Sequence, residues 1–119
     1  MKHLHFDVET AGFYGAYWAC TGGSDCAVIA MIGDDPEDWL ARSAVKWLCG
    51  RGVNVLTMSP AKKDYGHHNY PLERVETAIS WLKANGNHKI GIAGASTTGT
   101  LALTAAAMFP DVTLTIAMT

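Results

Sequence analysis

Apolar and polar residues alternate along residues 2–9, and this period of two predicts a β-strand with one covered face. Residues 13–18 follow Gly12, are rich in aromatic side chains and predict a second strand. Because the connection between them is short, we expect the two strands to pair as an antiparallel hairpin. One face of the first strand carries Leu4, Phe6 and Val8, and the other carries His3, His5, Asp7 and Glu9.

Later segments show the pattern of more deeply buried strands. Residues 26–32 are apolar without interruption, which is typical of a strand covered on both faces by helices. Residues 53–58 and 90–93 are similarly short and mainly apolar, and each predicts a further strand. Residues 112–118 alternate apolar side chains with threonines and predict the last one.

A helix is predicted after the strand at 26–32. Asp35 is expected to cap it, Pro36 suits its first turn, and Gly50 ends it. Leu40, Ala44, Trp47 and Leu48 fall on one face of this helix, which is expected to be the buried one.

Two more helices are predicted further along the chain. One opens at Pro71 and ends at residues 85–87, with an apolar stripe of Leu72, Val75, Ile79 and Leu82. The other covers residues 97–109 and stops at Pro110. It is rich in alanine and apolar on nearly every side, which predicts a helix enclosed by protein.

From residue 26 onward, strands and helices alternate. This order predicts a parallel sheet with right-handed crossovers and helices on both faces. We therefore expect an α/β fold, a three-layer sandwich whose mostly parallel sheet begins with an antiparallel hairpin. The 119 residues suffice for one domain.

Composition narrows the functional classes. The net charge is −2 and both signs are mixed along the chain, so no basic stripe suited to nucleic acid or to a membrane surface is expected. No run approaches the about 20 apolar residues of a membrane span, and the N-terminus does not resemble a signal peptide. We expect a cytoplasmic protein whose cysteines, Cys20, Cys26 and Cys49, are reduced and buried.

The segment with the clearest chemistry is residues 90–99. It places Ser96 in the turn between a buried strand and a buried helix. A sharp turn there needs small neighbours, and Gly94 and Ala95 provide them. The helix that follows directs its first N–H groups at the same point, where an oxyanion could be stabilised.

This segment resembles the nucleophile elbow of the α/β-hydrolase superfamily, G-x-S-x-G. Thr98 stands in place of the last glycine, and Gly99 comes one residue late. Residues 70–82 also resemble the helix before the elbow in dienelactone hydrolases and in acyl-CoA thioesterases of the bile-acid-CoA acyltransferase type. The resemblance implies a serine hydrolase that cleaves a carboxylic ester or an acyl thioester through an acyl-enzyme, without a cofactor.

Site residues follow from the same resemblance. Ser96 would be the nucleophile, and the oxyanion hole would use the N–H of Thr97 and one from the Gly33–Asp34 turn. That turn lacks the His-Gly pattern of many lipases. Because a backbone donor depends on geometry alone, this departure weakens the resemblance more than it weakens the expected chemistry.

The superfamily orders its triad as serine, then acid, then histidine. After Ser96 this chain has Asp111, in a turn position, and no histidine. We therefore expect residues 1–119 to be the N-terminal portion of a single α/β-hydrolase domain, inactive or nearly so alone. The expected partner is the C-terminal half, as continuous chain or as a cleaved fragment, pairing at the strand 112–118.

Other interpretations remain open. Ser96 could simply cap a helix, and the fold could serve a noncatalytic ligand- or protein-binding domain. His67 or His68 could act as the base only with an unusual triad order. A phosphate-binding loop is disfavoured because Thr100 stands where the lysine belongs, and the glycine spacing does not fit a dinucleotide fold.

Histidines are common metal ligands, so those outside residues 90–99 are considered as a possible metal site. His3 and His5 share a strand face, but the sequence offers no third ligand, so a solvated polar face explains them more simply. No metal site is therefore predicted. His88 precedes a strand and is expected to be structural.

Overall fold

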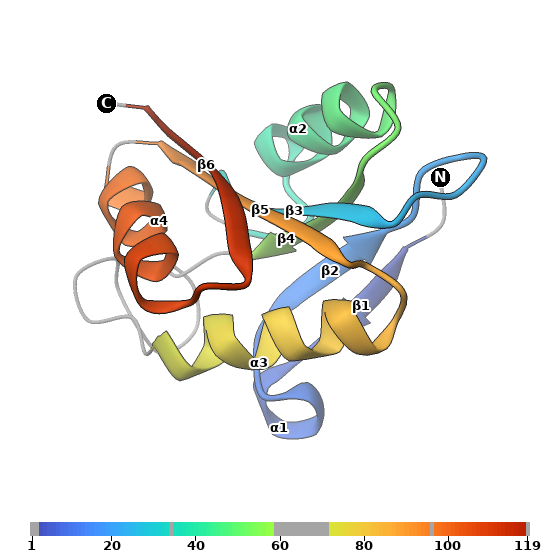
Figure 1. Cartoon of the computed structure of the whole chain (residues 1–119). Helices are drawn as coiled ribbons and strands as arrows, with labels where there is room; N and C mark the ends of the chain where they lie inside the picture. The colour runs from blue at the N-terminus through green and yellow to red at the C-terminus, as the bar shows by residue number, and fades with distance from the viewer. Residues whose placement is uncertain (1–2, 34, 59–71, 96, 119) are drawn as a thin grey trace.

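The computed structural model describes residues 3–33, 35–58, 72–95 and 97–118. Within them six strands form one sheet: β1 (Leu4–Phe6), β2 (Gly15–Trp18), β3 (Cys26–Met31), β4 (Asn54–Met58), β5 (Lys89–Ala95) and β6 (Val112–Met118). The helices are α1 (Val8–Ala11), α2 (Trp39–Cys49), α3 (Leu72–Ala84) and α4 (Thr97–Met108). Figure 1 shows α2 on one side of the sheet and α3 and α4 on the other.

The strands lie in the order β1-β2-β4-β3-β5-β6. The pairs β1–β2 and β2–β4 are antiparallel, whereas β3 pairs in parallel with both β4 and β5, and β5 with β6. The predicted α/β class, the N-terminal hairpin and the mostly parallel sheet are thus confirmed.

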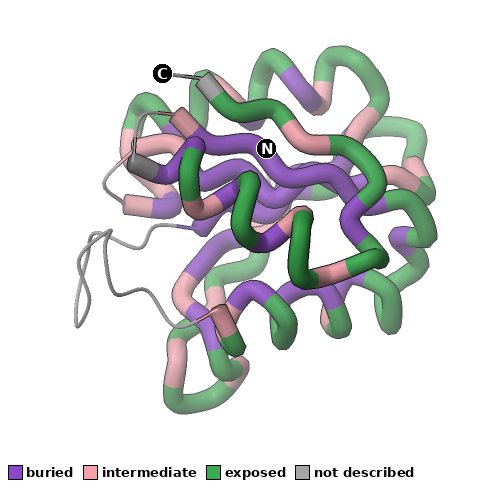
Figure 2. Tube along the Cα trace, turned by 60° about the vertical axis from the view of Figure 1, so that its left-hand side comes forward, coloured by how far each residue is buried: buried purple, intermediate pink, exposed green. Residues whose placement is uncertain are grey.

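Two hydrophobic clusters fill the space between the layers. The smaller lies under α2 and includes Trp18, Val45 and Val55. The larger lies under α3 and α4 and includes Ile29 and Leu82. In Figure 2 the inner strands are buried over almost their whole length, as the uninterrupted apolar segments predict.

The first strand is shorter than predicted. Strand β1 ends at Phe6, and residues 8–11 form α1 instead. Asp7 caps this helix, because its carboxylate accepts hydrogen bonds from Thr10 N (2.9 Å) and Thr10 Oγ1 (2.8 Å). These two bonds lower the pKa of Asp7. Capping by Asp7 and the left-handed Gly12 (φ 85°) override the alternating pattern of residues 7–9.

The start of α2 was also predicted wrongly. Its N-cap is Asp38, whose carboxylate accepts from Ala41 N at 2.8 Å, and not Asp35. The buried face also differs from the prediction: Leu40 and Trp47 are 43% and 55% exposed, whereas Leu48 is buried as predicted. The residues buried on α2 are Ala41, Val45 and Leu48.

Helix α4 is not enclosed on every side by the described residues. Ala102 and Ala105 pack into the larger cluster, but Leu103 and Met108 are 56% and 57% exposed. On the neighbouring strand β6, Leu114 and Ile116 are exposed as well. Strand β6 ends the sheet order, with β5 as its single neighbour among the described strands. This side of the molecule combines an open strand edge with apolar side chains.

Two buried asparagines tie together the amino ends of β4 and β5. The side chain of Asn54 accepts from Cys20 N (2.9 Å) and donates to Ser24 O (3.0 Å) and Asn87 Oδ1 (2.9 Å). Asn87 donates in turn to the Tyr17 hydroxyl and to Leu82 O. These bonds satisfy polar groups that water cannot reach.

We predict that Asn54→Ala lowers the free energy of unfolding by about 2–4 kcal/mol, because it leaves buried partners without hydrogen bonds. Urea denaturation followed by circular dichroism measures the change. Asn85→Ala is the matched control, since the exposed Asn85 side chain donates one bond, to Trp81 O, and should lose less than about 1 kcal/mol. Equal losses in the two variants would contradict a stabilising role for the buried network.

Candidate active site

The strand order changes direction between β3 and β5. The chain leaves β3 through α2 toward β4 on one side, and leaves β5 through α4 toward β6 on the other. The two helices cover opposite faces of the sheet (Figure 1). Such a switch point opens a crevice at the carboxyl ends of the strands, where α/β proteins bind their ligands.

Register places two predicted site segments at this switch point. Met31 at the end of β3 pairs with Gly94 near the end of β5. Gly33 follows Met31 by two residues, and Ser96 follows Gly94 by two residues. The Gly33 turn and the start of α4 therefore leave the sheet from adjacent positions.

The turn from β5 into α4 is tight. A Cβ added at Gly94 would overlap the carbonyl group of Thr98 and lie 3.0 Å from Gly99 N. Any side chain at Gly94 would force strand and helix apart. The close approach predicted for the elbow thus depends on this glycine.

Thr98, which departs from the elbow pattern, has a defined part in the turn. Its side chain is buried, and its hydroxyl accepts from Ala95 N (2.8 Å) and donates to Ala95 O (2.7 Å). Both polar groups of Ala95 are therefore held by one side chain three residues ahead. A glycine at position 98 would provide neither bond.

The Gly33 turn is shaped by Asp38. Gly33 has a left-handed backbone (φ 97°), and a Cβ there would overlap the Asp38 carboxylate. The same carboxylate accepts from Asp35 N (3.2 Å) and from Ala41 N (2.8 Å). One acid thus sets both the turn and the start of α2.

Buried and aromatic hydroxyls fix the remainder of this loop. Thr57 donates its hydroxyl to Pro36 O at 2.7 Å, and Tyr14 donates to Asp35 Oδ1 at 3.0 Å. Burial raises the pKa of Tyr14 to about 12, helped by its bond to Asp35 and by the charges of Asp35 and Glu37. Tyr14 therefore stays a neutral donor in neutral solution.

His3 and His5 contact the same loop. Nε2 of His3 and Nδ1 of His5 lie 3.1 Å and 3.0 Å from one oxygen of Glu37. Burial raises the pKa of Glu37, but the hydrogen bonds and charges of the two imidazoles outweigh it and lower this pKa overall. These histidines thus anchor the β3–α2 loop to β1, and are not merely a solvated face.

Some of the predicted site residues lie in the part of the chain that the structure describes, and others lie outside it. Thr97 begins α4, and Gly33, Gly94 and Ala95 have the positions given above. Residues outside the described part of the chain are Ser96, Asp34, His67 and His68.

The remaining predicted residues do not belong to the β5–α4 turn. Asp111 is exposed, and its carboxylate forms an ion pair with the Lys83 ammonium group of α3 at 2.9 Å. The side chain of His88 is exposed, whereas its backbone N–H donates to Asp25 O.

Metal clusters and membrane-spanning helices were searched for among the described residues. They contain no group of three or more metal-ligating side chains, and their cysteines are free thiols. None of the helices in this part of the chain is long and apolar enough to cross a membrane.

Several anchoring residues could not be found from the sequence. The contacts of Glu37 with His3 and of Tyr14 with Asp35 join segments more than 20 residues apart. The hydroxyl of Thr98 was visible only as a departure from a motif. Asp is a favoured N-cap residue, but this preference applies to Asp35 as much as to Asp38, so the sequence does not single out Asp38.

We predict that Glu37→Gln flattens the acid dependence of stability. Because the folded-state pKa of Glu37 is lowered, its carboxylate stabilises the fold above the unfolded-state pKa, and this contribution disappears as pH falls through the folded-state pKa. Urea unfolding from about pH 7 to about pH 3 should show the variant losing about 1 kcal/mol or less at neutral pH and declining less steeply in acid. Glu76→Gln, on the exposed face of α3, is the control with the same charge change. A wild-type acid slope in Glu37→Gln would refute the assignment.

Comparison with known proteins bears on the fold. No protein-family model matches the chain. Among solved structures, the α/β hydrolase GrgF from Penicillium sp. sh18 aligns with a TM-score of 0.75 and 22% identity, over 98% of this chain and 44% of its own.

Two structures of a cold-adapted esterase from an Arctic intertidal metagenomic library also align over 98% of this chain. The PEG-bound complex has a TM-score of 0.72 and 18% identity over 58% of its length, and the zinc-bound structure 0.68 and 20% over 56%. The chain spans about half the length of the structures it matches. The chain therefore has the α/β-hydrolase fold over the part of that fold which it spans.

Proposed function

We propose that this chain supplies the nucleophile and the oxyanion hole of a serine hydrolase that cleaves a carboxylic ester or an acyl thioester. The observation that carries the proposal is the tight β5–α4 turn, in which Gly94 packs on Thr98 beside the Gly33 turn at the switch point. In the sequence Ser96 stands between Ala95, which ends β5, and Thr97, which begins α4, and the solved structures that share the fold include an esterase.

In this mechanism Ser96 attacks the acyl carbon, and its proton passes through the triad histidine to the alcohol or thiol that leaves as the acyl-enzyme forms. Water then hydrolyses the acyl-enzyme, which releases the acid and restores the Ser96 hydroxyl. The N–H of Thr97 and an N–H of the Gly33–Asp34 turn stabilise the oxyanion that develops. The first turn of α4 adds the positive end of its dipole. Both donors belong to the backbone, so the anchoring of the two turns decides whether they converge.

The triad acid and histidine belong, in this proposal, to a C-terminal portion of the same protein, in one chain or as a separate fragment. We propose that this portion binds at the free edge of β6. Leu114 and Ile116 of β6 are exposed, and the strand has one neighbour among the described strands. A strand added there would satisfy backbone groups and cover apolar surface. Without that portion Ser96 has no base and stays an ordinary alcohol.

Finer assignments rest on the sequence resemblance. A relation to dienelactone hydrolases and acyl-CoA thioesterases favours a small ester or thioester substrate, handled without a cofactor. A reduced cytoplasmic compartment suits the free thiols of Cys20, Cys26 and Cys49.

A fluorophosphonate probe tests the nucleophile. Expressed with the coding sequence that surrounds these 119 residues, the protein should be labelled, Ser96→Ala should lose the label, and the isolated chain should be labelled weakly or not at all. Ser43→Ala, at an exposed position on α2, is the control and should label normally. Equal labelling of the Ser96→Ala variant would exclude Ser96, and a longer protein that does not label at all would favour the noncatalytic binding domain.

The turn itself can be tested through Thr98. Thr98→Val keeps the shape of the side chain but removes both bonds to Ala95, so labelling should slow by about tenfold or more as the turn loosens. Thr98→Ser retains the hydroxyl and should stay within about threefold of wild type. Thr104→Val, whose exposed hydroxyl donates to Thr100 O, should leave the labelling rate unchanged. A normal rate in Thr98→Val would show that these bonds do not position the nucleophile.

A further inference from the structure

The loop between β3 and α2 forms a closed turn next to Gly33. The backbone N–H of Asp38 donates to Asp35 O at 3.1 Å, and the Asp38 carboxylate accepts from Asp35 N at 3.2 Å. The same carboxylate occupies the space that a Cβ at Gly33 would need. A displacement of residues 35–38 would therefore also displace the Gly33 backbone.

The hydroxyl of Thr57 holds this turn against the sheet. Thr57 is fully buried in β4, and its Oγ1 lies 2.7 Å from the carbonyl oxygen of the buried Pro36 and 3.2 Å from Ala16 O. Because a hydroxyl has a single proton to donate, the shorter contact indicates a bond to Pro36. The same oxygen accepts from Trp18 Nε1 at 3.3 Å. Valine has nearly the same shape and suits a buried strand, so these hydrogen bonds are what distinguishes threonine at this position.

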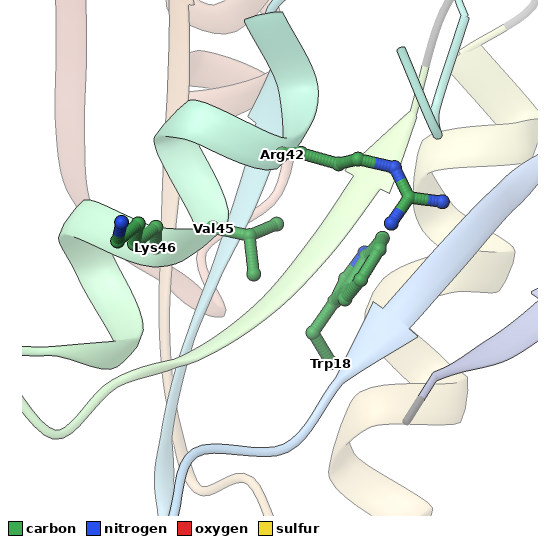
Figure 3. Close-up of a pocket in the computed structure, with 4 residues that line it drawn as sticks. All are labelled: Trp18, Arg42, Val45 and Lys46. Carbon is green, nitrogen blue, oxygen red and sulfur yellow. The ribbon is translucent and has the colours of Figure 1, made fainter. Parts of the chain in front are cut away.

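Tyr14 provides a second side-chain contact to the same turn, because its hydroxyl donates to Asp35 Oδ1 at 3.0 Å. A further contact reaches Glu37, whose carbonyl oxygen accepts from Arg42 Nε at 2.8 Å. Figure 3 shows Arg42 extending over the indole of β2, with the guanidinium carbon 5.1 Å from the ring centre. Arg42 is exposed, so water can compete for its bond, whereas the bond of Thr57 is buried.

We propose that Thr57 and Tyr14 are positioning residues for the oxyanion hole: by holding residues 35–38 they fix the turn that donates to the oxyanion. This inference rests on the proposed function, in which the Gly33–Asp34 turn supplies an N–H. A backbone donor stabilises the transition state only at hydrogen-bond distance from the position that the oxyanion takes. Loss of either hydroxyl should therefore slow the chemical step and leave binding of the neutral ester nearly unchanged.

The test is hydrolysis of p-nitrophenyl acetate by the protein expressed with the coding sequence that surrounds these 119 residues. We expect Thr57→Val to lower kcat by about tenfold or more and to change KM by less than about twofold. Thr57→Ser retains the hydroxyl and should keep kcat within about threefold of the wild type. Tyr14→Phe, a smaller change at a partly buried site, should lower kcat by about threefold or more, again with KM nearly constant.

Asn54→Ala is the matched control, because Asn54 is also a buried polar residue of β4 but lies at the amino end of the strand. It should destabilise the fold and leave kcat unchanged at temperatures well below unfolding. An equal fall of kcat in Asn54→Ala would reduce the effect to lost stability and overturn the proposal. Wild-type kcat in both Thr57→Val and Tyr14→Phe would overturn it as well, and so would a Thr57→Ser variant as slow as Thr57→Val. If Thr57→Val does not fold, Tyr14→Phe decides by the same comparison of kcat with KM.

This inference and the proposed function fail in different ways. A Ser96→Ala variant that still hydrolyses the ester would remove the proposed function, and the positioning role with it. Activity that depends on Ser96 but keeps its full kcat without the hydroxyls of Thr57 and Tyr14 would overturn the positioning role alone.

Discussion

The parallel pairing of β3 with β5 is the constraint on which the arrangement of this protein depends. Both strands are buried over nearly their whole length, and their pairing runs from Cys26–Lys89 to Met31–Gly94. Because side chains alternate with a period of two, a slip of one residue would turn apolar side chains from one cluster into the other. The same register brings the Gly33 turn beside the β5–α4 turn. The register that packs the core is therefore also the register that brings the two turns of the candidate site together.

Buried elements were predictable because their signals are local. The apolar run of residues 26–32 and the order of strands and helices were enough for the α/β class. Small residues before Ser96 likewise indicated a tight turn. What the sequence could not supply was the order of the strands in the sheet, since that depends on contacts between distant segments. The switch point between β3 and β5 became visible only in the structure.

The wrong predictions share a physical cause. At residues 7–11 a capped helix competes with continuation of the strand, and at the start of α2 two aspartates compete to be the N-cap. Pattern alone does not choose between the alternatives in either place. Asp38 prevails over Asp35 because its carboxylate also meets Gly33 and Asp35 N. Asp7 prevails over strand continuation because Thr10 supplies two donors. Local capping chemistry, once satisfied, outweighs a short alternating pattern.

The Asn54–Asn87 network lies at the amino ends of β4 and β5, opposite the end at which the Gly33 turn and α4 begin. Backbone amides close to it, such as that of Cys20, should exchange with solvent only when the whole domain opens. Amides at the carboxyl ends are held by individual side chains and can open in smaller steps. Substitutions among the side chains that hold the Gly33 turn and the start of α4 can therefore reshape that end of the sheet, while the asparagine network at the other end maintains the fold.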